Sequence, residues 1–291
     1  MTNLFFDSGA TKCDCILLDE RHRYVQHFTG AGINASYADD ATIDAAMAQF
    51  AEQTGSDVQE IVFAGAGCGN AQNAARVRKA IEAHYHATTI VVESDLAGAC
   101  RLLGGGEPCM VAILGTGAAA CRYDGQQITE ISPSLGWMLG DEGSGTHLGK
   151  SLLTAYLSDA LPHPSRKTLE ERYRLSREYI LHRLYQEPQP NLFMSQFAPF
   201  LRENLTEPAV RQIVASAFNT FFAKQKSYYP DSEGLPWHFT GSVAAHFEEV
   251  LRESAETSGC QIGEITGDPM TRLCSLSQNH SFHKPIENCD L

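Results

Sequence analysis

The sequence has no C-x-x-C motif, no excess of basic residues and no long hydrophobic run, and each absence excludes a class of function. Zinc ribbons, thioredoxin-type sites and simple iron–sulfur sites use closely spaced cysteine pairs. The nine cysteines include only one close pair, Cys13 and Cys15, on alternate positions of an apolar run. A formal net charge of −13 argues against nucleic acid, because phosphate neutralisation needs clustered Lys and Arg. The longest uncharged apolar stretch, Pro108 to Cys121, is too short and too rich in glycine to span a bilayer.

Two further signals are missing. No basic segment followed by a long apolar one opens the chain, so no secretion signal is recognised. We therefore expect a cytoplasmic protein with reduced thiols and with no nucleic acid or membrane partner. A Walker A loop is also absent, because "GKS" at 149–151 lacks the glycine five residues before Gly149.

What the sequence does contain is an α/β pattern that occurs twice. A chain of 291 residues with 43% hydrophobic content is long enough for two domains. Short apolar runs ended by glycine open the chain, followed by alternating helix and strand patterns, and a similar β-rich start begins at "CMVAILGTG". This repeat predicts two related lobes, 1–110 and 111–280, with a helical insertion near 155–235 and a tail at 281–291.

Three loops with small residues could hold phosphate. In "DSGATK", Asp7 ends a strand, Gly9 permits close backbone approach, and Thr11 and Lys12 supply donors; the alternative is an ordinary hairpin turn. The second loop, "LGTGAA", offers backbone N–H groups and has the same alternative. In the third, "FTGSVAAHF", a strand turns into an amphipathic helix. The residues of the second and third loops are Gly115, Thr116, Gly117, Gly241 and Ser242.

"FAGAGCGNA", around Gly65, Gly67 and Gly69, lacks the spacing of a dinucleotide-binding loop. We interpret it as a packing turn between a strand and a helix.

Asp95 in "VVESDLAGAC" is the acid–base candidate. It follows a buried strand at the start of a helix, where a carboxylate could accept a proton from a substrate hydroxyl. A helix N-cap is the competing interpretation, and either Ser94 or Asp95 would serve in that role. Strand alternation turns Glu93 to the opposite face.

The stretch "LGWMLGDEGSGTHLGKSLL", residues 135–153, is glycine-rich and predicts a loop where backbone comes close to a ligand or to the core. Its Asp-Glu pair supplies too few ligands for a calcium loop. The role of Glu142 stays open.

Taken in order, "DSGATK", "LGTGAAAC", "GDEGSG" and "FTGSVAAHF" resemble the phosphate-1, phosphate-2, connecting and adenosine segments of the sugar kinase, Hsp70 and actin superfamily. "SDLAGA" followed by "LGTG" and "GDEGSG" is similar to the N-acetylglucosamine kinase branch of the BadF/BadG/BcrA/BcrD ATPase family. The resemblance implies two actin-like (ribonuclease H-like) lobes with a nucleotide cleft, ATP with Mg²⁺, and an amino sugar as substrate. Homodimers are common among such kinases.

Residue by residue, the resemblance implies that Asp7 orients the metal, through water, and that Asp95 is the catalytic base. Nucleotide contacts are implied for Gly9, Thr11, Lys12, Gly115, Thr116, Gly117, Gly241 and Ser242. Sugar contacts are implied for Asn34, Gly136, Trp137 and Asp141.

The lead-in "SLGWMLGDEGSG" is about two residues shorter than the family's usual "GGWG" segment, which leaves N-acetylglucosamine, N-acetylmuramic acid and glucosamine as candidate substrates. Two alternative functions remain. One is an ATPase that activates a partner enzyme, and the other is a sugar-sensing protein without catalysis.

Overall fold

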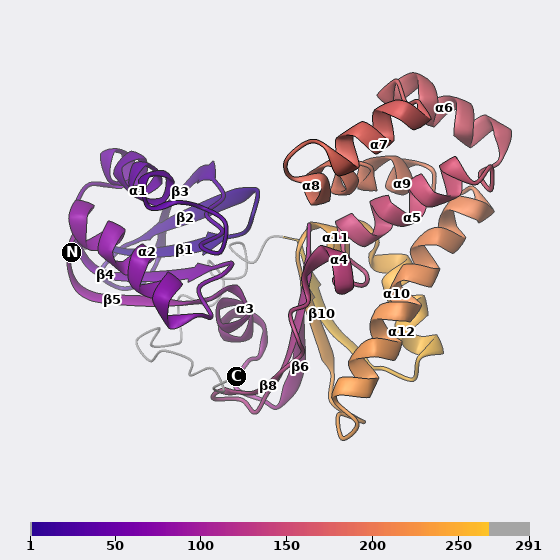
Figure 1. Cartoon of the computed structure of the whole chain (residues 1–291). Coiled ribbons are helices and arrows are strands. Elements are labelled where there is room, and N and C mark those ends of the chain that lie inside the picture. The colour runs from indigo at the N-terminus through magenta and orange to yellow at the C-terminus, as the bar shows by residue number, and fades with distance from the viewer. Residues whose placement is uncertain (1, 268–291) are drawn as a thin grey trace. The chain divides into compact units, whose positions relative to one another are not determined.

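The computed structural model describes residues 2–267, which contain two five-stranded sheets and twelve helices (Figure 1). The described residues divide into two compact units. The first comprises 2–111 with 123–130, and the second comprises 112–122 with 131–267. The predicted tail, 281–291, lies outside the described residues.

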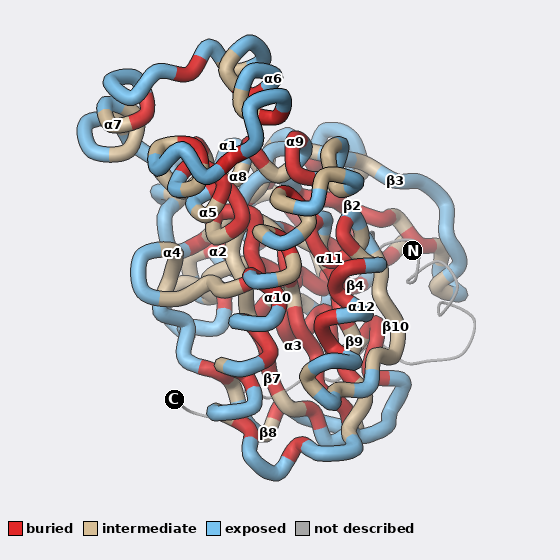
Figure 2. The backbone as a smooth tube through the Cα atoms, turned by 90° about the vertical axis from the view of Figure 1, so that its right-hand side faces the viewer, coloured by how far each residue is buried: buried red, intermediate tan, exposed pale blue. Residues whose placement is uncertain are grey.

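The sheet of the first unit has the order β3-β2-β1-β4-β5. The first three strands form the predicted antiparallel meander, and β4 and β5 run parallel to β1. In Figure 2, β3 is largely exposed because it is an edge strand. The strands are β1 (Thr2–Ser8), β2 (Lys12–Leu18), β3 (Tyr24–Ala31), β4 (Asp57–Gly65) and β5 (His86–Ser94).

The helices of this unit follow local signals. Asp39 caps α1 (Asp40–Thr54), which ends at Gly55, and Asn70 caps α2 (Ala71–His84). The third helix, α3 (Asp95–Leu103), contacts β1, β4 and β5.

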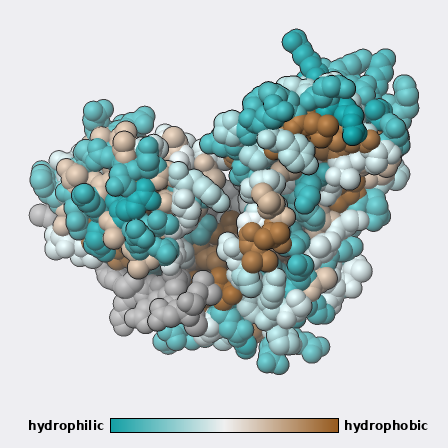
Figure 3. Space-filling model, viewed as in Figure 1, coloured by the Kyte–Doolittle hydropathy of each residue, from teal (hydrophilic) through white to brown (hydrophobic). Residues whose placement is uncertain are grey.

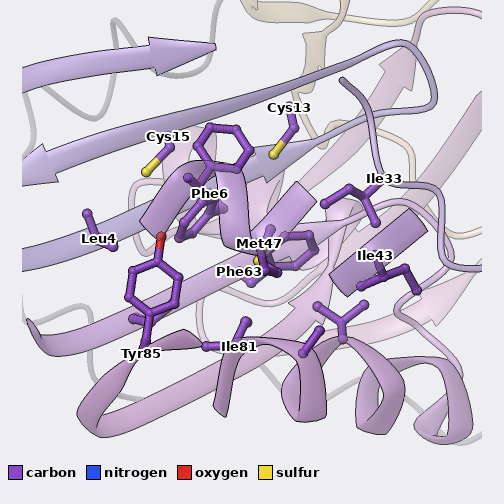
Figure 4. Packing of buried hydrophobic residues seen from close by; sticks show 14 of the residues in the cluster. Leu4, Phe6, Cys13, Cys15, Ile33, Ile43, Met47, Phe63, Ile81 and Tyr85 are labelled. Atoms are coloured by element: carbon purple, nitrogen blue, oxygen red, sulfur yellow. The ribbon is translucent and has the colours of Figure 1, made fainter. Parts of the chain in front are cut away.

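Large apolar side chains of β1, α1 and α2 pack into one core. Phe6 lies edge-on to Phe50 with ring centroids 5.3 Å apart, and Met47 and Ile81 are buried beside them (Figure 4). Cys13 and Cys15 point into the same core from β2, which is why their alternate spacing gives no metal site. All cysteines within residues 2–267 are free.

The second sheet has the order β8-β7-β6-β9-β10, which repeats the topology of the first sheet strand for strand. Strands β9 and β10 are parallel to each other, as β4 and β5 are. This repeat confirms the predicted duplication. The strands are β6 (Cys109–Leu114), β7 (Ala118–Tyr123), β8 (Ile128–Ile131), β9 (Trp237–Thr240) and β10 (Ile262–Thr266).

The helical insertion lies between β8 and β9. It comprises α4 (Gly136–Leu139), α5 (Gly145–Leu157), α6 (His163–Tyr173), α7 (Arg177–Tyr185), α8 (Pro190–Ser195), α9 (Ala198–Glu203) and α10 (Pro208–Tyr228). Two helices, α11 (Ser242–His246) and α12 (Glu248–Thr257), connect β9 to β10. Aromatic side chains of α10 and β9, including Phe221 and Trp237, are fully buried against one another.

Two local expectations need correction. The lead-in expected as a loop contains the helical turn α4, whose Met138 and Leu139 are 65% and 72% exposed. Figure 3 shows this apolar surface as a brown patch at the place of α4. The helix expected after Gly241 is two helices, because Phe247 leaves the helical conformation between α11 and α12. No helix within residues 2–267 is long and apolar enough to cross a membrane.

Candidate functional site

The β1–β2 turn and the Asn34 segment form one packed cluster in the first unit. The hydroxyl of Ser8, fully buried, accepts a hydrogen bond from the Ile33 amide at 2.8 Å. Gly32 donates to the Thr11 carbonyl at 3.2 Å. A Cβ on Gly32 would lie 2.5–2.6 Å from backbone atoms of Gly9, Thr11 and Lys12. Only glycine permits this approach, so the segment that carries Asn34 is held directly on the turn that carries the predicted phosphate donors.

Lys12 has a partner that the sequence interpretation missed. Its Nζ lies 2.6 Å from Oδ2 of Asp14, a buried carboxylate that also accepts from Thr29 Oγ1 at 2.9 Å and lies 2.9 Å from His27 Nε2. Asp14 and Asp7 occupy paired positions of β1 and β2, so both side chains lie on the same face of the sheet. The signal in the sequence was the spacing Lys12-x-Asp14 within a strand, which places both side chains on one face.

Asn34 takes part in a turn. Its Oδ1 accepts from the Ser36 amide at 3.0 Å, and its carbonyl accepts from Tyr37 and Ala38. Gly67, at φ 80°, packs so closely that a Cβ would lie 2.6–2.8 Å from Ser36 and Asn34. The "FAGAGCGNA" segment is therefore a packing turn, as predicted, and its Gly67 packs against the turn that contains Asn34.

At the start of α3, Ser94 and Asp95 have different roles. Ser94 is the N-cap, since its Oγ accepts from the Ala97 amide at 3.1 Å. Asp95 is the first helical residue and accepts only a local bond from Leu96, at 3.0 Å. Burial raises the pKa of the Asp95 carboxyl above its ordinary value. Because Ser94 fills the cap, Asp95 is not the N-cap of α3.

The neighbouring acid, Glu93, is occupied elsewhere. Arg101 donates to both of its carboxylate oxygens, from Nε at 3.1 Å and from a terminal nitrogen at 2.8 Å. Cys68 lies near Asp95 instead; burial and the Asp95 charge raise the pKa of its thiol to about 12. Asp95 thus carries a raised pKa and forms no ion pair within residues 2–267.

In the second unit, the predicted phosphate loop between β6 and β7 is held by the start of α5. The Gly145 amide donates to the Gly115 carbonyl at 2.8 Å, and the amide and hydroxyl of Thr146 donate to the Thr116 carbonyl at 3.2 and 2.7 Å. Gly115 also donates to the Gly117 carbonyl at 3.0 Å. These bonds define the path of the loop backbone.

Asp141 lies against the same loop. Its Oδ1 accepts from the Ala118 amide at 3.2 Å, and a Cβ on Gly117 would come within 3.2 Å of its carboxylate. The backbone of Asp141 is left-handed, with φ 57°. Burial is the main cause of its raised pKa, with the Glu142 charge adding to it. Asp141 therefore contacts the loop at 115–117, called the phosphate-type loop below.

Glu142 anchors this segment to α10. It lies 3.4 Å from Lys224 Nζ, and the next residue, Gly143, packs on Phe221 and donates to His147 Nδ1 at 3.0 Å. Burial is the first cause of a lowered His147 pKa, so a neutral ring that accepts this bond is favoured.

The turn at Gly241 contacts the end of β6, directly before the loop at 115–117. Gly241, at φ 106°, packs on the Leu114 carbonyl so tightly that a Cβ would overlap it, and Ser242 is exposed. A Cβ on Gly145 would lie 3.5 Å from Val243. The second unit thus brings together the loops at 115–117, 141–146 and 241–243. Gly136 and Trp137 lie on α4, directly before this cluster in the chain.

No group of three or more His, Cys, Asp or Glu side chains able to hold a metal occurs within the described part of the chain. The candidate acids are instead single carboxylates, Asp7 and Asp95 in the first unit and Asp141 in the second.

Comparison with known proteins gives a family and a fold. A model of the BadF/BadG/BcrA/BcrD ATPase family matches residues 6–169. A proposed N-acetylglucosamine kinase from Porphyromonas gingivalis is 33% identical, with a TM-score of 0.85, and covers 96% of this chain and 99% of its own. No match was found among curated proteins.

More distant structures show the fold alone. A proposed N-acetylglucosamine kinase from Chromobacterium violaceum is 16% identical with a TM-score of 0.73, covering 95% of this chain and 99% of its own. A glucokinase of the ROK family from Streptomyces griseus, in complex with glucose and AMPPNP, is 15% identical with a TM-score of 0.56, covering 96% and 100%. With the repeated strand order, these similarities confirm the expected actin-like α/β fold.

Proposed function

The chain belongs to the BadF/BadG/BcrA/BcrD ATPase family, and from that premise we propose that it is an ATP-dependent kinase that phosphorylates a hydroxyl of a small amino sugar. The observation that carries the proposal is the cluster of three loops in the second unit. There the first amides of α5 donate to the carbonyls of Gly115 and Thr116, and Gly241 packs on the last residue of β6. A cluster of this kind presents backbone N–H groups to an anion.

The nucleotide contacts proposed are those of the predicted loops. Backbone groups of 115–117 hold a phosphate, and the turn at Gly241 and Ser242 lies beside the base and ribose. Gly9, Thr11 and Lys12 hold the transferred phosphate from the first unit. Lys12 already lies on Asp14, so this lysine exchanges or shares its ion-pair partner when phosphate binds.

Mg²⁺ is the metal that fits these residues. The half-buried Asp141 carboxylate beside the loop at 115–117 would repel phosphate unless a cation lies between them, and burial already raises its pKa. Mg²⁺ prefers one or two carboxylates, substrate phosphates and water over a protein cage. Asp7, through water, is the residue proposed to orient the ion, and Asp141 lies beside the loop proposed to hold a phosphate. When bound, it neutralises charge on the phosphates during transfer.

Asp95 is the proposed catalytic base. Its carboxylate takes the proton of the attacking sugar hydroxyl as the new P–O bond forms and the bond to the ADP oxygen breaks. The raised pKa makes it a stronger base than an ordinary aspartate, while Ser94 and Leu96 hold it at the helix start.

The sugar contacts proposed are Asn34, Gly136, Trp137 and Asp141. N-acetylglucosamine is the favoured substrate, since the relative that is 33% identical is a proposed N-acetylglucosamine kinase. The short lead-in, with its exposed α4, keeps N-acetylmuramic acid and glucosamine as substrates to compare. A cytoplasmic location, where ATP is abundant, and a homodimer are further parts of the proposal.

The test is a sugar panel with the purified full chain and MgATP, measuring both ADP release and the phosphorylated sugar. We expect ADP release that requires an amino sugar and equals the phosphosugar formed. Equal ADP release with and without sugar would instead support an ATPase that activates a partner. No ATP turnover, together with sugar binding, would support a sugar-sensing protein.

The base assignment is tested in the same assay by Asp95→Asn. We expect the rate to fall about 10²- to 10⁴-fold, with ATP binding retained. Asp124→Asn is the matched control, because Asp124 accepts from the Gln126 and Gln127 amides in an exposed turn. An Asp95→Asn rate equal to that of the control would show that another group accepts the proton.

A further inference from the structure

The first amides of α5 have an uncommon set of partners. The first N–H groups of a helix have no acceptor within the helix. In α5 these amides donate outside it: Gly145 to the Gly115 carbonyl and Thr146 to the Thr116 carbonyl. Two successive carbonyls of the loop between β6 and β7 therefore point toward the start of this helix.

The direction of these carbonyls determines the direction of the amides that follow. In a trans peptide the C=O and the next N–H point in opposite directions, and no cis peptide occurs in the described residues. The N–H groups of Thr116 and Gly117 are thus turned away from α5, on the same side of the loop. Two neighbouring amides with this direction can donate to one anion.

The Thr116–Gly117 peptide is the weaker point of this arrangement. It is flanked by Thr116 and by Gly117, and Gly117 has no Cβ to restrict rotation on its side of the peptide. The Thr146 amide reaches its carbonyl at 3.2 Å, whereas the Thr146 hydroxyl reaches it at 2.7 Å. The hydroxyl therefore supplies the shorter of the two bonds that fix this peptide.

The surroundings of Thr146 favour this bond. The side chain is buried, with 1% of the residue exposed, so water does not compete for its proton. A second acceptor, the Asn191 carbonyl at the start of α8, lies at 3.2 Å. A hydroxyl donates one proton, and the shorter distance assigns it to Thr116.

We propose that Thr146 is a positioning residue for the kinase reaction: its hydroxyl holds the Thr116–Gly117 peptide with the amide directed toward the nucleotide phosphate. It touches no substrate itself. This inference rests on the proposed function for its effect on ATP, and on the hydrogen bonds alone for its effect on the loop.

The test compares Thr146→Val, Thr146→Ser and Thr154→Val. Valine keeps the shape of threonine and removes the hydroxyl, and serine keeps the hydroxyl. Thr154 is the matched control, because it lies on the same helix and its hydroxyl donates only to the exposed Lys150 carbonyl at 2.8 Å. We expect Thr146→Val to raise the KM for ATP about fivefold to tenfold, as expected for one lost hydrogen bond.

The KM for the sugar should stay within about twofold, Thr146→Ser should restore the KM for ATP, and Thr154→Val should match the parent protein. Equal KM values for ATP in the two valine variants would overturn the proposal. So would an equal rise in the KM for ATP and the KM for sugar, which indicates a general structural effect.

A second readout needs no catalysis. Hydrogen–deuterium exchange of a peptide covering 112–120 reports the loop without nucleotide. We expect faster exchange in Thr146→Val than in Thr154→Val, and unchanged exchange would contradict the positioning role. If the parent protein has no kinase activity but this difference in exchange is present, the proposed function fails while the loop assignment stands.

Discussion

At the scale of single residues, the start of α3 has two adjacent side chains, Ser94 and Asp95. The sequence allowed either of them to be the helix N-cap. Ser94 satisfies the helix N-terminus, so Asp95 is not needed there for stability. Burial raises the Asp95 pKa, which is a cost to the folded state at neutral pH. A carboxylate whose burial raises its pKa, and which its helix does not need as the N-cap, is a candidate for chemistry.

The first prediction concerns this cost. The folded state holds the Asp95 proton more tightly than the unfolded state, whose aspartates titrate near pH 3.9, so the free energy of unfolding falls as pH rises from there through the raised pKa. Asp95→Asn should therefore raise Tm at pH 7 to 8, and the difference should shrink as pH falls toward 4. Thermal unfolding followed by circular dichroism measures it.

Asp124→Asn gives the opposite sign and serves as the comparison. Hydrogen bonds from Gln127 and Gln126 lower the Asp124 pKa, so its charged form contributes stability above the unfolded pKa and loses it as pH falls. At neutral pH, Asp124→Asn should lower Tm slightly. A lower Tm for Asp95→Asn at pH 7 to 8 would refute the burial cost.

At the scale of elements, α5 connects the phosphate-type loop to the helical insertion. Its first turn donates to Gly115 and Thr116, and its middle packs on α8. The contact depends on Gly149, where a Cβ would overlap the Met194 backbone. Backbone cannot move aside as a side chain can, so the two helices are as close as glycine allows.

Gly149→Ala should consequently separate α5 from α8. We expect destabilisation of about 1–3 kcal/mol from overpacking, partly offset by the roughly 1 kcal/mol better helix propensity of alanine. Lys150→Ala, at the exposed neighbouring position, should leave the free energy of unfolding nearly unchanged. Chemical denaturation of the three proteins measures the effect, and a more stable Gly149→Ala would show that the helices have room.

At the scale of the whole molecule, one strand order occurs twice, and the two copies contain different members of the proposed set of functional residues. The first copy holds Asp7, Asn34 and Asp95, and the second holds the loops at 115–117, 141–146 and 241–243. The helical insertion belongs only to the second copy, where it supports the phosphate-type loop through α5 and the Glu142 segment through α10.

Metal removal tests the proposal that a cation lies between the Asp141 carboxylate and the ATP phosphates. Chelation should abolish phosphoryl transfer and weaken ATP binding in the parent protein about tenfold or more, because Asp141 then faces phosphate without a cation. Asp141→Asn should bind ATP with a smaller dependence on Mg²⁺. Asparagine tolerates the left-handed φ of 57° at this position, so the backbone is expected to stay unchanged. Calorimetry with and without Mg²⁺ measures the difference, and equal metal dependence in both proteins would contradict the assignment.

Much of the fold could be predicted from the sequence because its signals are local. Gly55 and Gly104 follow the ends of α1 and α3, and the two β-rich starts have similar patterns. The order of the glycine loops was enough to indicate the family, since each loop depends on a short run of residues. The α4 turn was missed, because four residues give no helical period.

What only the tertiary structure decided are the pairings between distant residues. The sequence alone did not determine the partner of Lys12. The pairing of β2 with β3 brings Asp14, His27 and Thr29 together beside it. Thr146 and Thr116 are 30 positions apart, and nothing in either segment predicts their bond. Local sequence determines which backbone conformations are favourable, and therefore where the loops occur. Packing of the whole chain decides which donor meets which acceptor, and therefore which residues hold the phosphate-type loop in position.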